Sequence, residues 1–329
     1  MFLLAAHALA QDVVSLEYVK AGQVGLANPA LRVIVNQELR GLTVSMRCGG
    51  TSVEHAGQHP AGDRVELPIK VPVGSHTCRG TLSVLAADGS EGAMPLSFGV
   101  AMHPALGITL KPGSLDLAAR RLTVTLDRPS SKVEVDALGL GGAALGGGLL
   151  PVSVPAGTPI EVEWKSSGEV LKLKIRGYDA DGFFSEIELV PWSYTIPHED
   201  VVFATDSAVI EPAEEPKLRT ALADARKVVE KYGKDVIIKL YVGGHTDTVG
   251  DAAHNRELSM KRARAIAGWF EANGFPGDIF FQGYGEGDLA VPTGDGVDEP
   301  RNRRVAYLLA ARPPEAGGGG GDHGWEKLK

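Results

Sequence analysis

The sequence lacks the features that mark several common protein classes. No stretch reaches the roughly 18 consecutive apolar residues that a transmembrane helix requires. The chain has only two cysteines, Cys48 and Cys78, and neither has a partner at a metal-binding spacing. Its formal net charge is −8, so it lacks the basic surface with which general nucleic-acid binders meet phosphates. These absences argue against a membrane-spanning helix and against nucleic acid as a partner.

The composition indicates a globular protein with many turns. The chain has 329 residues, which suffice for two or three domains, and 43% of them are hydrophobic. Its 42 glycines and 20 prolines suit a chain in which short strands alternate with turns.

Residues 1–10, MFLLAAHALA, are mostly apolar and carry no Lys, Arg, Asp or Glu. Ala8-Leu9-Ala10 is an A-x-A pattern, and polar Gln11-Asp12 follows it, as after the cleavage site of a secretory signal peptide. We therefore interpret residues 1–10 as the remnant of a signal peptide that lacks the positively charged N-terminal region. The alternative is a buried first strand.

If the protein is exported, its two cysteines can form a disulfide, because disulfides persist in oxidising compartments. Cys48 and Cys78 both lie in strand-like surroundings. We expect a disulfide between them, and two buried free thiols are the alternative.

Two strand-rich blocks follow, at residues 11–101 and 102–195. LRVIVNQ (31–37), LTVSMRC (42–48) and RVELPIKV (64–71) exemplify the first block, and several such segments alternate apolar with polar residues. RRLTVTLDRP, PIEVEWKS and EVLKLKIRGYDADG exemplify the second. Regular short strands at this spacing predict two all-β sandwich domains of the immunoglobulin-like type.

The segment Gly139 to Ala144 matches the glycine spacing of a dinucleotide-binding fingerprint. That motif needs a helix directly after it, so that the helix N-terminus meets the pyrophosphate. Further glycines and LLPVSVP follow instead, which predicts a loop.

Residues 196–312 differ in character, because strands and helices alternate. Val201–Ser207 reads as a strand, Glu214–Gly233 as an amphipathic helix, Asp235–Gly244 as an apolar strand and Asn255–Asn273 as a second helix. DIFFQGYGEG and RRVAYLLA supply two more strands. We predict an α/β domain with a mixed sheet and helices on one face, followed at residues 313–329 by a flexible glycine-rich tail.

A group of charged and polar residues in this domain indicates a possible ligand site. Asp247 follows the end of a buried strand, and Asn255, Ser259 and Arg262 fall at steps of four and three on one helix face. If that helix packs over the strand end, Asp247 and Arg262 come close. A carboxylate and a guanidinium at the opening of one pocket can bind a zwitterionic ligand. The protein carboxylate then binds the ligand's ammonium, and the guanidinium binds the ligand's carboxylate.

The motifs GHTD-x-x-G, Asn255, LS-x-x-RA, GYGE and NRRV, in this order and spacing, resemble the OmpA-like domain family. The resemblance covers residues 201–312. It implies non-covalent binding of peptidoglycan through the diaminopimelate of the stem peptide, without a cofactor. By matching motifs it implies Asp247 and Arg262 as principal ligands, Asn255 and Arg303 as supporting residues, and Leu258 as an apolar neighbour.

The chain departs from the family pattern at the rim of this site. His254 stands where the family usually has an aromatic residue, Ala204 where some relatives place a polar residue, and the stretch before NRRV is short.

Simpler interpretations of the same residues stay open. Asp247 and Arg262 could form a structural ion pair, Asn255 could cap the helix, and Arg303 could lie in a solvated strand start. His245 and His254 with Asp247 suggest a metal site, but no regular spacing presets the two histidines, and we expect none.

The sequence shows no convincing catalytic set. Asp278, Glu286 and Asp288 occur in a turn-rich stretch, and no nucleophile is paired with a base. We expect an exported, non-catalytic protein of the periplasm or outer membrane that tethers something to the cell wall, with the N-terminal β domains as spacers or as contacts to another envelope protein.

The alternative is a wall-targeted enzyme with its active site in the N-terminal β domains. Those domains offer only His55, His59, His76 and Asp63, in or near loops and without a motif. A third hypothesis, a motor stator or secretion-system anchor, would need a transmembrane helix in this chain or upstream of Met1.

Overall fold

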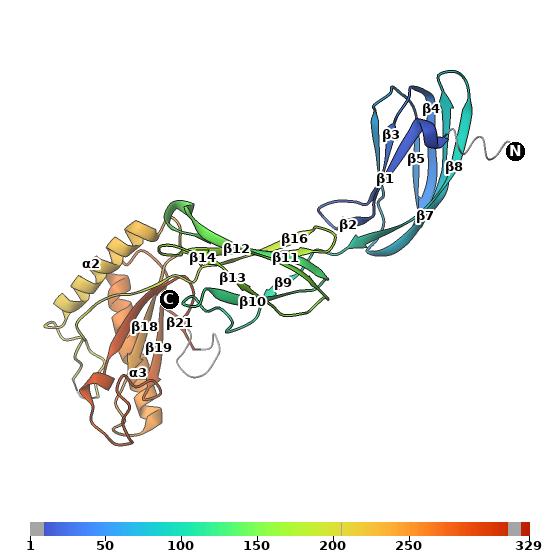
Figure 1. Ribbon diagram of the computed structural model, residues 1–329. Coiled ribbons are helices and arrows are strands. Elements are labelled where there is room, and N and C mark those ends of the chain that lie inside the picture. Colours follow the sequence, from blue (N-terminus) through green and yellow to red (C-terminus); the bar gives the residue numbers. More distant parts are fainter. Residues whose placement is uncertain (1–9, 205, 315–323) are drawn as a thin grey trace. The chain divides into compact units, whose positions relative to one another are not determined.

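The computed structural model describes residues 10–204, 206–314 and 324–329 (Figure 1). Most regular structure is β-strand in several sheets, and the long helices lie in the C-terminal third. The chain forms two compact units, the first mainly from residues up to 133 and the second mainly from residues after 187. Segments between 134 and 186 belong in part to each unit, so the domain boundaries at 101/102 and 195/196 stay predictions.

The N-terminal part contains two sheets that enclose one hydrophobic core. One sheet has the order β1-β3-β6 and the other β2-β8-β7-β4-β5. The strands are β1 (Val14–Val19), β2 (Ala21–Gln23), β3 (Ala30–Val35), β4 (Leu39–Cys48), β5 (Thr51–His59), β6 (Arg64–Pro68), β7 (Gly74–Ala86) and β8 (Glu91–His103). Alternate residues of these strands face inward, as the period of two in the sequence requires, and Val33, Val44 and Leu82 are among those fully buried.

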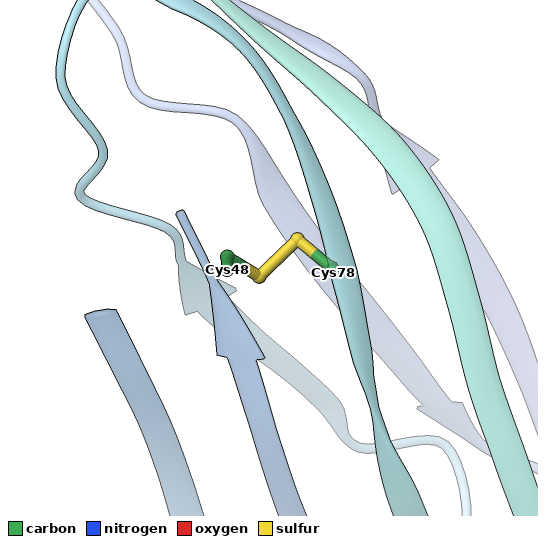
Figure 2. The surroundings of a disulfide bond; sticks show 2 residues. All are labelled: Cys48 and Cys78. Carbon is green, nitrogen blue, oxygen red and sulfur yellow. A yellow bond between two sulfur atoms is a disulfide. The ribbon is translucent and has the colours of Figure 1, made fainter. Parts of the chain in front are cut away.

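The predicted disulfide is present in this part. Cys48 of β4 and Cys78 of β7 lie directly opposite each other in an antiparallel pair, and their sulfur atoms are 2.06 Å apart (Figure 2). Both cysteines are fully buried among the core residues. The bridge therefore joins two neighbouring strands within one sheet.

Residues 1–9 of the predicted signal segment lie outside the described part of the chain. Ala10, the last residue of that segment, is helical, as are residues 11–13, and it is buried in the N-terminal core.

The next strands form two further sheets, β13-β10-β9 and β14-β12-β11-β15-β16. The elements are β9 (Ile108–Leu110), β10 (Arg121–Leu126), β11 (Ser130–Leu138), β12 (Ala144–Val154), β13 (Ile160–Glu163), β14 (Lys165–Ser166), β15 (Lys172–Asp179) and β16 (Phe184–Leu189). The glycine-rich segment from Gly139 forms a short 3₁₀ turn, η1 (Leu140–Gly142), and leads into strand β12 instead of the helix that a dinucleotide site needs.

The C-terminal part is an α/β domain. Its sheet has the order β17-β20-β18-β19-β21, in which β18 and β19 are parallel and the other neighbours are antiparallel. The elements are β17 (Ser193–Thr195), α2 (Glu215–Tyr232), β18 (Lys239–His245), α3 (Ala252–Ala272), β19 (Ile279–Gly285), η2 (Pro300–Asn302), β20 (Val305–Ala310) and β21 (Glu326–Lys327). The predicted mixed sheet and both predicted helices are therefore confirmed.

One core joins the helices to the sheet. Leu218 and Leu222 of α2 and Phe270 of α3 share a buried cluster with Leu240 and Val242, alternate residues of β18. Because alternate residues of a strand face the same side, both helices cover one face of the sheet.

Two expectations about strands were wrong. Val201–Ser207 is not a strand at any described position, and β17, just upstream, takes the place beside β20. The tail predicted to be flexible contains a described strand, β21, which pairs with β19. Trp325 lies edge-on against Tyr241, with ring centroids 5.1 Å apart, on the face that the helices leave open. A single aromatic anchor and a two-residue strand carry no periodic signal in the sequence.

Candidate functional site

The site lies where helix α3 crosses the ends of strands β18 and β19. A Cβ atom on Gly244 would come within 2.2 Å of the backbone oxygen of Ser259, so the helix can approach this closely only over a glycine. Ser259 also accepts a hydrogen bond at its Oγ from the backbone N–H of Gly285, at 2.9 Å. The GHTD, LS-x-x-RA and GYGE motifs thus meet in one place for reasons of packing.

A pocket of about 440 Å³ opens beside this crossing, and all five residues predicted for the ligand site line it. Its lining consists of Val202, Phe203, Asp206, Thr246, Asp247, Val249, His254, Asn255, Leu258, Arg262, Asp298 and Arg303. The lining is mixed, with two arginines and three aspartates among apolar side chains.

Asp247 pairs with Arg303 instead of Arg262. Its Oδ2 accepts a hydrogen bond from Nη1 of Arg303 at 2.5 Å, and its Oδ1 accepts one from the backbone N–H of Val249 at 3.3 Å. The Asp247 side chain is 9% exposed. An ionised carboxylate has about four acceptor positions, so Asp247 keeps capacity for another donor.

Arg262 is buried without a carboxylate partner among the described residues. It is 6% exposed, and its Nε donates to the backbone oxygen of Ser207 at 2.9 Å. Its Nη2 reaches the backbone oxygen of Ala204 at 3.4 Å, and its guanidinium lies 5.2 Å from the ring centre of Phe203. Carbonyl groups and a ring satisfy its donors but form no direct ion pair with the guanidinium.

Burial and neighbouring charge act on both arginines. Burial, and after it the positive charge of Arg303, lower the pKa of Arg262, while the negative charges of Asp247 and Asp206 oppose the effect. Hydrogen bonds with Asp298 and Asp247 raise the pKa of Arg303. The two residues stay charged, and Arg262 has more to gain from an added anion because its charge is less compensated.

Asn255 does not cap helix α3. Asp251 is the cap, and its Oδ1 accepts hydrogen bonds from the backbone N–H groups of Ala253 and His254. The Asn255 side chain donates to the backbone oxygen of Val249 at 3.1 Å and to Oε2 of Glu286 at 3.2 Å. It therefore fixes the loop that carries Asp247.

The sequence did not point to several further residues of the pocket. Phe203 stacks on Arg262, Asp298 is paired with Arg303, and Asp206 pairs with His254 at 2.9 Å. Asp206 and Asp298 are 68% and 73% exposed, so both belong to the rim. No motif marks them, because loops bring them to the pocket.

The two histidines considered for a metal site have other partners. His245 is 3% exposed, donates from Nδ1 to the backbone oxygen of Asp288 at 3.1 Å and stacks on Tyr284. Burial and the charge of Arg304 lower its pKa to about 4. His254 lies at the rim, 54% exposed. No group of three or more His, Cys, Asp or Glu residues in the described part of the chain is arranged to hold a metal ion.

Residues 202–303 match the model of the OmpA family, so the C-terminal third is an OmpA-like domain. The chain is 33% identical over 118 residues to a photosystem I chlorophyll a apoprotein of Gloeobacter violaceus, covering 34% of this chain and 13% of that protein. It is 30% identical over 130 residues to outer membrane protein A of Klebsiella pneumoniae, covering 39% of this chain and 35% of that protein. The chain thus spans about a third or less of these curated relatives.

Among solved structures, that of the peptidoglycan-associated lipoprotein from Burkholderia pseudomallei is similar to part of this chain. The match covers 33% of this chain and 88% of that protein's chain. Its TM-score is 0.28 and its sequence identity 21%. None of the described helices is both long enough and apolar enough to span a bilayer.

Proposed function

We propose that the pocket binds peptidoglycan non-covalently, through the diaminopimelate residue of the stem peptide. The observation that carries the proposal is Arg262, a buried cation at a pocket wall without an anionic partner among the described residues. A buried charge is stable when it is paired, so this site gains from a carboxylate supplied by a ligand.

The free end of diaminopimelate carries an ammonium beside a carboxylate, and the pocket offers a matching pair. The carboxylate meets the guanidinium of Arg262, and the ammonium meets Asp247, which keeps free acceptor positions. Phe203 and Leu258 give apolar contact to the methylene chain between the two ends of the residue. Asp206 and Asp298 add negative charge at the rim, which favours approach of the ammonium.

Arg303 has a supporting role in this proposal. It is 39% exposed and bridges Asp247 and Asp298, so it holds the Asp247 carboxylate in place from the solvent side. Its long side chain can move when the ligand ammonium approaches the same carboxylate.

The wider role follows from the family. Several relatives, such as outer membrane protein A of Klebsiella pneumoniae, are outer membrane proteins, and we propose that this chain is an exported protein of the periplasm or the outer membrane that is held at the cell wall. The N-terminal sheets would form immunoglobulin-like sandwiches that act as spacers or bind another envelope protein, without catalysis.

The test is co-sedimentation of the full chain with purified diaminopimelate-type cell-wall sacculi. Wild type is expected to sediment with the sacculi, and Asp247→Ala and Arg262→Ala to stay in solution. Arg264→Ala is the matched control, because Arg264 lies on the exposed face of the same helix. Thermal unfolding of each variant checks that the fold is kept. Sedimentation of both Asp247→Ala and Arg262→Ala at the wild-type level would refute the site.

A further inference from the structure

A chain of polar contacts lies in the N-terminal part, far from the OmpA-like domain in sequence. The Nε2 atoms of His55 and His59 are 2.9 Å apart, and Nδ1 of His59 is 2.7 Å from Oδ2 of Asp63. The His59 side chain is 13% exposed and that of Asp63 is 40% exposed. The group is thus partly sheltered and still open to solvent.

The pairing of the two rings follows from the strand that carries them. His55, Gly57 and His59 are alternate residues of β5, so they share one face of the sheet, which is also the face of buried Val53. A Cβ atom on Gly57 would lie 2.9 Å from Nε2 of His59 and 3.5 Å from Nε2 of His55. Because Gly57 has no side chain, the two imidazole rings can occupy the space above it and approach each other.

Asp63 fixes the tautomer of His59. A carboxylate accepts a hydrogen bond, so Nδ1 of His59 carries the proton and Nε2 presents its lone pair towards His55. Histidines that bind metals are oriented in this way, with the distal ring nitrogen donating to a carboxylate. The Asp63 carboxylate also accepts at Oδ1 from the backbone N–H of Arg64, which holds it in place.

The separation of the two Nε2 atoms suits a metal ion between them. Metal–imidazole bonds of about 2.0 Å at a right angle place two nitrogen atoms about 2.8 Å apart, whereas a tetrahedral angle requires about 3.3 Å. The observed 2.9 Å, which the hydrogen bond between the rings sets, lies closer to the right-angle value, so the rings need to move least for a square or tetragonal site. Cu²⁺ prefers that geometry and binds imidazole more tightly than the other divalent first-row ions do.

We propose that His55 and His59 form a two-histidine site for a tetragonal divalent ion, with Cu²⁺ as the preferred metal and Asp63 as the residue that orients His59. Solvent fills the remaining coordination positions. When the ion binds, the proton of His55 moves from Nε2 to Nδ1, so both imidazoles bind as neutral ligands.

The test is titration of the metal-free full chain with Cu²⁺, followed by calorimetry and by electron paramagnetic resonance. The expected result is one ion per chain bound at this site, with a tetragonal signal that carries hyperfine coupling from two nitrogen atoms. His55→Gln and His59→Gln should each lose the two-nitrogen signal and weaken binding at least tenfold. His76→Gln, which removes another histidine of the same part of the chain, should leave both unchanged.

Two further variants separate a metal site from a hydrogen-bonded pair that only closes the edge of the core. Asp63→Ala should weaken Cu²⁺ binding about 10- to 100-fold, as loss of an orienting carboxylate does. Gly57→Ala should weaken it too, because the new methyl group enters the space between the rings. Absence of a two-nitrogen signal in wild type, or its persistence in His55→Gln and His59→Gln, would overturn the proposal. Thermal unfolding without metal shows whether each variant is folded.

Discussion

Replacement of Arg262 by alanine tests the account at its most specific contact. The change removes a buried guanidinium that has no carboxylate partner among the described residues. Hydrogen bonds to a charged partner contribute about 1.5–3 kcal/mol, and loss of one member of a buried charge pair costs about 2–5 kcal/mol. For this partly sheltered pocket we expect a loss of about 2–3 kcal/mol, which is about 30- to 150-fold in affinity.

The assay is calorimetric titration with two stem peptides that differ only at the third residue. One peptide carries diaminopimelate and the other lysine, which has the ammonium and lacks the neighbouring carboxylate. Wild type should prefer the diaminopimelate peptide by the same 30- to 150-fold or so, and Arg262→Ala should bind both peptides with similar, weak affinity. Arg262→Lys should recover part of the preference, because it keeps the charge but loses the planar fork.

The double comparison separates a ligand contact from a structural role. If Arg262 only orders the loop that contains Ser207, its loss weakens both peptides by the same factor and leaves their ratio intact. An unchanged preference in Arg262→Ala would therefore refute the reasoning. The exposed Arg264→Ala control should leave both affinities at the wild-type level.

Other predictions concern the stability of the fold. His245 has a folded-state pKa of about 4 against about 6.5 when unfolded, so the unfolded chain binds more protons between these values and stability falls by about 3 kcal/mol as the pH drops from 6.5 to 4. Denaturant unfolding across this range should show a smaller pH slope for His245→Gln, and an equal slope would contradict the assignment. Gly244→Ala places a methyl group against the Ser259 carbonyl and should cost about 2 kcal/mol or more, seen as a lower Tm; an unchanged Tm would refute the close approach. Replacing Cys48 and Cys78 by serine opens a crosslink between residues 30 apart and should cost about 3–4 kcal/mol in denaturant unfolding, with no loss arguing against the bridge.

The sequence predicted the helices and central strands of the OmpA-like domain because each carries its own periodic signal. The sequence marks one apolar stripe on α2, formed by Leu218, Leu222, Ala225 and Val229. The first three are buried, and Val229 is partly buried against the same core. Strand β18 begins at Lys239, later than expected, and Ile237 just before it is 82% exposed. A run of apolar residues alone cannot locate the first residue of a strand, because pairing with the neighbouring strand decides where the strand begins.

The sequence placed five of the residues that line this pocket near one another, but it did not predict how they pair. The spacing on α3 put Asn255 and Arg262 on one face, and GHTD put Asp247 at a strand end, so packing brought them together. Whether Asp247 pairs with Arg262 or with Arg303 depends on the loops that set the reach of each arginine. Phe203 and Asp298 also lie in loops, and no periodic sequence pattern marks them.

Retention of the wild-type chain on diaminopimelate-type sacculi, in the presence of free amino-acid competitors, tests the central claim most directly. Added diaminopimelate should release the bound chain in a concentration-dependent way, while lysine at the same concentration should leave it bound. Release by both amino acids alike, or by neither, would contradict recognition of a paired ammonium and carboxylate in this pocket.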